Sequence, residues 1–215
     1  MTHHNLNLTA LLGARICHDM ISPIGAIGNG LELLSIAGDA GGTLTDLIED
    51  SAANANARLR LFRIAFGPTS DQTISSAELG DVTNGYFGDG NFKITWPKGA
   101  DFSRSEAQLA LLLCLVLETT MSRRGQVEFL SPKRIVGKTM RNMLTHPYWT
   151  VMCGNGAWPA DLAPGDVQFP LTRNALEDMG QELRAWVDGQ EFGIDLAPVP
   201  DSIKTELFRH QQLGI

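Results

Sequence analysis

The sequence predicts an α+β protein that begins with an antiparallel helical hairpin and continues into a C-terminal α/β sandwich. Two observations support this fold class. Apolar residues recur at helical spacing from about Leu8 to Ala37 and again from about Leu44 to Phe66, whereas strand-like and helix-like segments alternate after residue 76. We therefore expect a hairpin domain in residues 1–68 and an α/β domain in residues 77–215.

The first predicted helix has an apolar face, with a histidine on the opposite side. At about 100° per residue, seven apolar side chains fall within one arc, as in an amphipathic helix: Leu12, Ile16, Met20, Ile24, Ile27, Leu31 and Leu34. The other side carries His18 together with Leu11, Ala14, Ile21, Ser22 and Gly25, and Arg15 lies one turn below. We therefore expect His18 to be exposed.

Pro23 interrupts the hydrogen bonding of this helix shortly after the histidine. A proline inside a helix costs about 3 kcal/mol or more, because it removes one backbone donor and clashes with the preceding turn. A helix that keeps this cost beside an exposed His18-Asp19 pair suggests a functional reason. The alternatives are a tolerated kink and a solvated histidine without a role.

The second predicted helix follows a turn of small residues, Gly38-Asp39-Ala40-Gly41-Gly42. Thr43 and Asp46 have the spacing of a capping box at its start. Two long helices joined by so short a loop should lie antiparallel, which would bring His18 about level with residue 63. Arg60 and Arg63 would then be neighbours of the histidine, although both could equally be solvated.

A single hairpin cannot bury the apolar faces of both helices, because two packed helices leave half of each face in contact with water. Pairing of two hairpins into a four-helix bundle removes this exposure. We therefore expect a homodimer.

Composition excludes several classes of function. The formal net charge of −7 and the pI of about 5.2 argue against direct binding to nucleic acid. No apolar run is long enough to span a bilayer and no signal peptide is evident, so we expect a cytoplasmic protein without a membrane anchor. The three cysteines are widely spaced and indicate neither a disulfide framework nor a zinc site.

Beyond a polar linker at 69–76, the pattern predicts a series of strands and helices. Strands are expected at 91–96, 127–130, 149–152 and 192–196. Helices are expected from about Arg104 to Met121, with Ser103 and Glu106 as a capping box, from about Arg173 to Val187, and from about Ser202 to Gln212.

The residues around His18 carry a resemblance to a known family. His-Asp-x-x-Ser-Pro-Ile at 18–24 resembles the H-box of dimeric histidine kinases, which lies on the first helix of their dimerisation and phosphotransfer hairpin. The longer run from Cys17 to Leu34, CHDMISPIGAIGNGLELL, is similar to the ChpT-type histidine phosphotransferases of alphaproteobacteria. This resemblance implies a homodimeric phosphorelay protein whose reactive group is His18.

The α/β part resembles the ATP-binding domain of histidine kinases in its order of elements, but three features of the nucleotide site are missing. The helix at 109–118 has no asparagine for Mg²⁺, and the Met152-Cys153-Gly154-Asn155-Gly156 segment has glycines without the aspartate that reads adenine. No Gly-x-Gly loop precedes the helix expected at Arg173. We therefore expect no ATP site, as in ChpT-type proteins, and an ordinary turn at the two glycines.

The resemblance assigns roles to individual residues. His18 would accept a phosphoryl group from the receiver aspartate of a CckA-type hybrid kinase and pass it to CtrA-type and CpdR-type response regulators, with Asp19 as a base or orienting group. Mg²⁺ would come from the receiver, and the protein would need no cofactor of its own. The partner-binding surface would comprise Ala14, Arg15, Ile21, Ser22, Gly25, Arg60 and Arg63.

Two other interpretations remain open at this point. A non-catalytic dimeric adaptor would bind receivers without transferring phosphate, and would keep its activity when His18 is replaced. A functional kinase with an unrecognised ATP site is disfavoured by the missing asparagine and aspartate.

Overall fold

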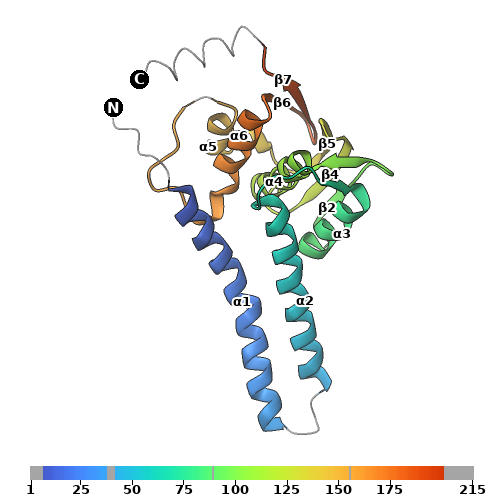
Figure 1. Cartoon of the computed structure of the whole chain (residues 1–215), viewed down its shortest axis with the longest axis vertical. Helices are drawn as coiled ribbons and strands as arrows, with labels where there is room; N and C mark the ends of the chain where they lie inside the picture. Colours follow the sequence, from blue (N-terminus) through green and yellow to red (C-terminus); the bar gives the residue numbers. More distant parts are fainter. Residues whose placement is uncertain (1–6, 38–41, 89, 155, 201–215) are drawn as a thin grey trace.

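The N-terminal hairpin consists of two long antiparallel helices, α1 (Leu8–Ala37) and α2 (Gly42–Ala65) (Figure 1). The computed structural model describes residues 7–37, 42–88, 90–154 and 156–200. Both helices lie within two residues of the predicted bounds. The loop residues at 38–41, on which the turn prediction rests, lie outside the described ranges.

The two helices approach each other closely at Gly30. A β-carbon at this position would lie 2.6 Å from Cγ1 of Ile48, so a larger residue would push the helices apart. The helix α2 already begins at Gly42, and Thr43 is therefore inside the helix. The prediction of Thr43 as the N-cap is wrong, because the chain becomes helical one residue earlier.

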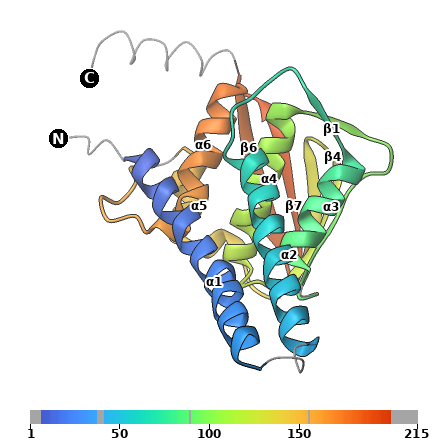
Figure 2. The same cartoon turned by 60° about the horizontal axis from the view of Figure 1, so that its bottom comes forward.

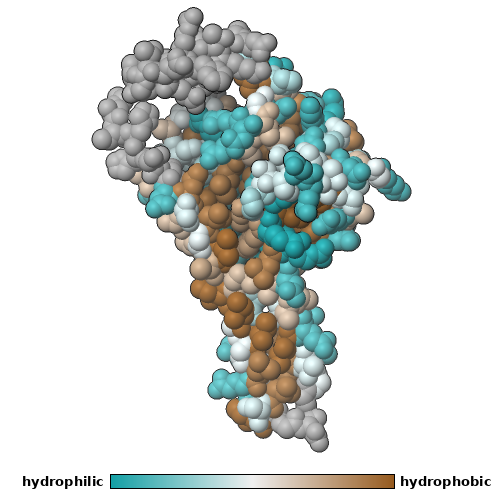
Figure 3. All heavy atoms as spheres, viewed as in Figure 1, coloured by the Kyte–Doolittle hydropathy of each residue, from teal (hydrophilic) through white to brown (hydrophobic). Residues whose placement is uncertain are grey.

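The apolar face of α1 is only partly covered. Pro23 is buried, and α1 continues as a helix through it. On one edge of the same face, however, Ile24 and Leu31 keep 56% and 53% of their surface exposed. Figure 3 shows hydrophobic side chains along the viewed face of the hairpin. The hairpin thus retains an apolar strip that a single chain does not cover.

The α/β part contains two sheets with helices packed against the larger one. Its elements are β1 (Thr73–Ser75), α3 (Ser76–Phe87), β2 (Phe92–Thr95), β3 (Asp101–Ser103), α4 (Arg104–Thr120), β4 (Gly125–Ser131), β5 (Arg134–Thr139), η2 (Met143–Thr145), α5 (Pro147–Met152), η3 (Pro164–Asp166), α6 (Gln168–Asp178), β6 (Gln181–Asp188) and β7 (Glu191–Pro198). The predicted linker is therefore partly ordered, since β1 lies inside it and α3 begins at its last residue.

The larger sheet has the strand order β2-β4-β5-β7-β6. Strands β2 and β4 are parallel and are joined through α4, whereas the other neighbouring pairs are antiparallel. The short strands β1 and β3 form a separate two-stranded sheet. This mixed arrangement confirms the predicted α+β class.

The helix α4 lies inside the molecule. Every residue from Leu109 to Leu117 is buried, which is typical of a helix that contacts protein on all sides. It packs against α2 and α6, and Figure 2 shows α2 in front of it and the strands behind. The start of α4 matches the prediction, because Ser103 and Glu106 form a complete capping box. The C-terminal half of the hairpin and the α/β part therefore share one core.

Residues 149–152 form the end of helix α5 and not the predicted strand. His146 caps this helix with its side chain and Pro147 occupies its first turn. Trp149 and Met152, three residues apart, are both buried, which is helical spacing. The β-branched pair Thr150-Val151 favoured a strand locally, but the cap and the burial pattern determine the structure.

The prediction of a helix from Arg173 to Val187 is also wrong in its second half. The helix α6 ends at Asp178, and Gly180, with a φ of +60°, turns the chain. The next segment is strand β6, which pairs with β7 across a tight turn at Gly189, where φ is +57°. The Asp188-Gly189 dipeptide is a strong hairpin signal that the helical interpretation overlooked.

The final helix predicted at 202–212 lies outside the described residues.

We predict that His146 makes the protein less stable in mild acid. Burial lowers the pKa of His146 below its ordinary value, and its Nδ1 accepts a bond from the backbone nitrogen of Tyr148 at 3.3 Å. The unfolded chain therefore binds a proton more readily, and stability falls as the pH drops below about 6.5, through the folded-state pKa. Thermal melts between pH 7 and pH 5 should show a smaller loss for His146→Asn, which keeps a capping group that does not titrate. Equal losses in both proteins would contradict this role.

Within the described residues, no helix has the length and apolar character needed to cross a bilayer.

Candidate functional site

His18 lies on the outward side of α1, with 85% of its side chain exposed. Ala14, Ile21, Ser22 and Gly25 are also exposed on this helix. A β-carbon at Gly25 would meet no atom within 4 Å, so no other part of the chain covers this surface of α1. Another molecule can therefore reach the histidine directly.

Asp19 is held in place beside the histidine. Its side chain is only 10% exposed, and Oδ1 lies 3.1 Å from Nδ1 of His18. Its other oxygen, Oδ2, accepts a hydrogen bond from Nε of Arg15 at 2.6 Å. Adjacent helix residues point in different directions, but here the carboxylate meets the edge of the imidazole.

This geometry determines which ring nitrogen is available for chemistry. Asp19 is an acceptor, so a neutral His18 satisfies the contact by carrying its proton on Nδ1. The lone pair then remains on Nε2, the nitrogen that makes no contact with Asp19. The arrangement presents an exposed nucleophile with its opposite nitrogen hydrogen-bonded to a carboxylate.

Arg15 points into the molecule, not outward as expected for a partner-binding residue. Its side chain is 13% exposed. Nη1 donates to the carbonyl oxygen of Gly165 at 2.7 Å and also lies 3.4 Å from Oε1 of Gln168. The arginine therefore joins α1 to the segment around η3 in the α/β part.

A pocket of about 440 Å³ surrounds this group and is lined from both parts of the chain. The hairpin contributes Arg15, His18 and Asp19, and the α/β part contributes Glu118, Thr119, Ser122, Arg123 and Gly165. The sequence analysis did not identify the second set. Those residues reach the histidine only through the packing of α4 and η3 against the hairpin.

The turn after α4 has an unusual backbone. Ser122 and Arg123 have φ values of 55° and 59°, a left-handed conformation that is uncommon for residues with a β-carbon. The backbone nitrogen of Arg123 donates to the carbonyl oxygen of Glu118 at 2.8 Å and fixes the turn. The exposed guanidinium of Arg123, with Nε 3.7 Å from Oε1 of Glu118, is thereby placed at the pocket that contains His18.

Half-buried polar groups lie near Arg15 on its inner side. Burial and the nearby Glu118 raise the pKa of Tyr86, so its hydroxyl stays protonated. Burial alone would lower the pKa of Arg15, but the negative charges that Tyr86 carries when ionised and that Asp19 carries more than offset this effect, and the pKa is raised. The guanidinium of Arg58 lies 5.5 Å from the centre of the Tyr86 ring. Arg15 is therefore charged at neutral pH, where Tyr86 is protonated and the Asp19 carboxylate is the anionic partner of the guanidinium.

Arg60 and Arg63 are exposed on α2, and neither lines the pocket around His18. In the described part of the chain, the arginine of α2 that approaches the buried side of the site is Arg58, through Tyr86. The close approach of Gly30 to Ile48 implies an antiparallel register in which residue 60, and not the predicted residue 63, lies about level with His18. In one chain, the structure does not bring the two predicted arginines to the histidine.

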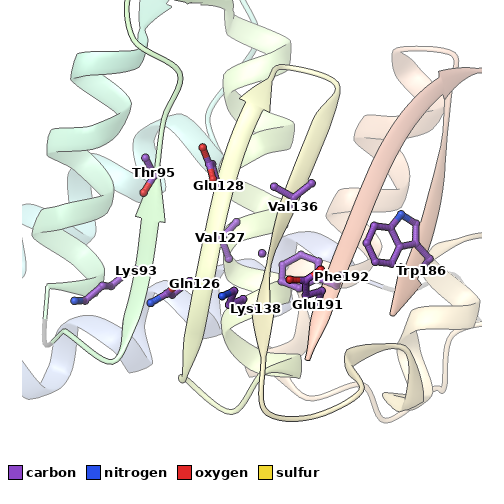
Figure 4. Close-up of a pocket in the computed structure, with 11 residues that line it drawn as sticks. Lys93, Thr95, Gln126, Val127, Glu128, Val136, Lys138, Trp186, Glu191 and Phe192 are labelled. Carbon is purple, nitrogen blue, oxygen red and sulfur yellow. The ribbon is translucent and has the colours of Figure 1, made fainter. Parts of the chain in front are cut away.

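A second hollow, of about 470 Å³, lies on the sheet and shares no residue with the His18 pocket. Figure 4 shows Lys93, Gln126, Lys138 and Glu191 from adjacent strands along it.

Among the described residues, no group of three or more histidine, cysteine or acidic side chains could hold a metal ion. Gly154 and Gly156 have φ values of +101° and +106°, as expected for turn glycines.

Comparison with known proteins places this chain in a family. A family model described as the histidine phosphotransferase C-terminal domain matches residues 76–191. The chain belongs to this family. The chain is 44% identical over 114 residues to the protein phosphotransferase ChpT of Brucella abortus (strain 2308). That alignment covers 52% of this chain and 54% of the relative, so it spans about half the length of each.

A solved structure extends the similarity over nearly the whole chain. The structure, described as that of a bacterial phosphotransferase, is 32% identical and has a TM-score of 0.71. The match covers 92% of this chain and 98% of the other. The predicted membership among the ChpT-type histidine phosphotransferases is thereby confirmed.

Proposed function

We propose that this histidine phosphotransferase relays phosphoryl groups between receiver domains in the cytoplasm through phosphorylated His18. The donor would be the receiver aspartate of a CckA-type hybrid kinase, and the acceptors would be CtrA-type and CpdR-type response regulators. The observation that carries the proposal is the exposed His18 imidazole, hydrogen-bonded through Nδ1 to an immobilised Asp19.

In the proposed reaction, Nε2 of His18 attacks the phosphorus of the receiver's acyl phosphate. A P–N bond forms, the P–O bond to the aspartate breaks, and the aspartate leaves as a carboxylate. The ring becomes cationic as the bond forms, and Asp19 stabilises this charge through Nδ1–H. The reverse sequence on a second receiver regenerates neutral His18.

Mg²⁺ is expected to be supplied by the docked receiver. Asp19 is the carboxylate beside His18, and its two oxygens already contact Arg15 and His18. It is therefore poorly placed to act as a metal ligand. In this proposal the ion neutralises the transferring phosphoryl group from the receiver's side, and this chain brings Arg123 to the pocket as an ion pair with Glu118.

We further propose that the protein acts as a homodimer and does not use ATP. The partly exposed Ile24 and Leu31 support a four-helix bundle, because a second hairpin would remove them from water. The apolar, fully buried stretch from Leu109 to Leu117 supports the absence of kinase activity, since it offers no side-chain oxygen for Mg²⁺ at the position expected from histidine kinases.

The proposal is tested by incubating the protein with a radiolabelled phospho-receiver and, in parallel, with labelled ATP. We expect label to move from the receiver to the protein and then to a second receiver, and no label to come from ATP. An adaptor would bind the phospho-receiver without acquiring label. Labelling from ATP alone would instead identify a kinase.

A further inference from the structure

Arg15 connects the reactive pair on the hairpin to the α/β part of the chain. Its Nε contacts Asp19 at 2.6 Å on the same helix, and its Nη1 contacts the carbonyl oxygen of Gly165 at 2.7 Å. The two contacts use different nitrogens of one planar guanidinium. The position of Asp19 is thus linked to a segment that lies 150 residues from Arg15 in the sequence.

Gln168 extends this link into the core. Its residue is 1% exposed, its Oε1 lies 3.4 Å from Nη1 of Arg15, and its Nε2 donates to Oγ1 of Thr119 at 3.0 Å. The Thr119 hydroxyl gives its own proton to the carbonyl oxygen of Leu115, so it must accept from Gln168. This fixes the amide with its oxygen toward Arg15. The network therefore joins α1, α4 and α6.

We propose that Arg15 is a positioning residue through which the α/β part holds Asp19, and hence His18, in the geometry for phosphoryl transfer. This inference rests on the proposed function and gives the α/β part a direct role in the reaction centre. The arginine acts through Asp19 and does not itself touch the phosphoryl group or the receiver.

The chemistry of the site requires an arginine at this position. A lysine carries a single ammonium group and cannot direct two rigid donors at Asp19 and Gly165 simultaneously. Without Arg15, Asp19 would be free to rotate toward water and the Nδ1 contact of His18 would be lost. Misplacement of a reacting group by about 1 Å can slow a reaction by roughly 100-fold.

The low exposure of Arg15 separates this role from a docking role. A residue that contacts the receiver would change the receiver concentration needed for half-maximal rate. A residue that only orients Asp19 would change the limiting rate at saturating receiver. Single-turnover transfer from a labelled phospho-receiver, measured over a range of receiver concentrations, gives both quantities.

A matched control exists on α6. Arg173 has the same pair of contacts as Arg15, with Nε 2.8 Å from Oε1 of Glu177 four residues on and Nη1 3.1 Å from the carbonyl oxygen of Val151. It does not line the His18 pocket. Arg173→Gln therefore removes an equivalent structural link without affecting the proposed reaction centre.

We expect Arg15→Gln to lower the limiting rate by about 10- to 100-fold, with an unchanged half-saturating receiver concentration. Arg15→Lys should not restore the rate, and Arg173→Gln should transfer like wild type. If Arg15→Gln does not fold, Gln168→Met, which keeps a side chain of similar length without its amide, should lower the limiting rate in the same direction.

Three outcomes would overturn the inference. One is a wild-type limiting rate for the folded Arg15→Gln and Gln168→Met proteins, and another is full rescue by Arg15→Lys. The third is a raised half-saturating concentration at an unchanged limiting rate, which would place Arg15 in the receiver contact. Failure of the wild-type protein to accept any label would instead reject the proposed function itself.

Discussion

Replacing His18 by alanine is expected to abolish phosphoryl acceptance from a phospho-receiver, lowering the rate by at least about 1,000-fold, because the substitution removes the nucleophile. No other imidazole lines the pocket among the described residues. The fold should persist, since the side chain is largely exposed and surface substitutions usually change the free energy of unfolding by about 0.5 kcal/mol or less. The measurement is label on the protein after incubation with a radiolabelled phospho-receiver.

The matched control for this variant is His146→Asn. His146 is also a histidine of the described chain, but it caps α5 and stacks on Phe169 at 4.7 Å between ring centres. Its replacement should leave phosphoryl acceptance unchanged. Equal labelling of wild type and His18→Ala would refute a phosphohistidine intermediate and would leave the adaptor interpretation.

The second large effect concerns assembly. A protein carrying both Ile24→Glu and Leu31→Glu should be monomeric in size-exclusion chromatography with light scattering, whereas wild type should have the mass of a dimer. The two positions lie on one side of α1 and are more than half exposed in a single chain, so the hairpin itself tolerates polar residues there. Burying the charges in a four-helix bundle would raise the dissociation constant by at least about 100-fold.

Ile36→Glu provides the control for this experiment. Ile36 is exposed on the same helix, but at about 100° per residue it faces away from Ile24 and Leu31. The single variant should keep the mass of wild type. A monomeric wild type, or a doubly substituted protein that remains dimeric, would contradict the proposed bundle.

The hairpin could be predicted from sequence because its pattern is long and local. The bounds of α1 match the apolar periodicity, and the exposure of His18 follows from its phase relative to Ile16 and Met20. The extent to which α2 covers the apolar face of α1 could not be predicted. Ile24 and Leu31 belong to the predicted apolar face, but only tertiary packing determines how much of that face α2 reaches.

The α/β part was harder to predict because propensity is a weak guide to short segments. Trp149-Thr150-Val151-Met152 has strand propensity but is helical, since the cap at His146 and burial at helical spacing prevail. The β6–β7 hairpin was mistaken for helix although Asp188-Gly189 indicates a turn. In both cases a local signal other than propensity decides the structure.

Only the part of the candidate site on α1 could be predicted from the sequence. His18 and Asp19 are adjacent in the chain and carry the resemblance to the H-box. The inward orientation of Arg15 depends on Gly165, and the place of Arg123 depends on the turn after α4. Gly165 and Arg123 are both more than a hundred positions from His18 in the sequence, so no local pattern could show that they line the same pocket.

The most direct test of the relay is the chemical nature and position of the label on the wild-type protein. After transfer from a radiolabelled phospho-receiver, we expect the label to be lost in acid and retained in alkali, as for a phosphoramidate. Peptide mapping should place it on the fragment that contains His18, and a second, unlabelled receiver should remove it. Label that is lost in alkali, that maps to another fragment, or that a second receiver cannot remove would contradict transfer through His18.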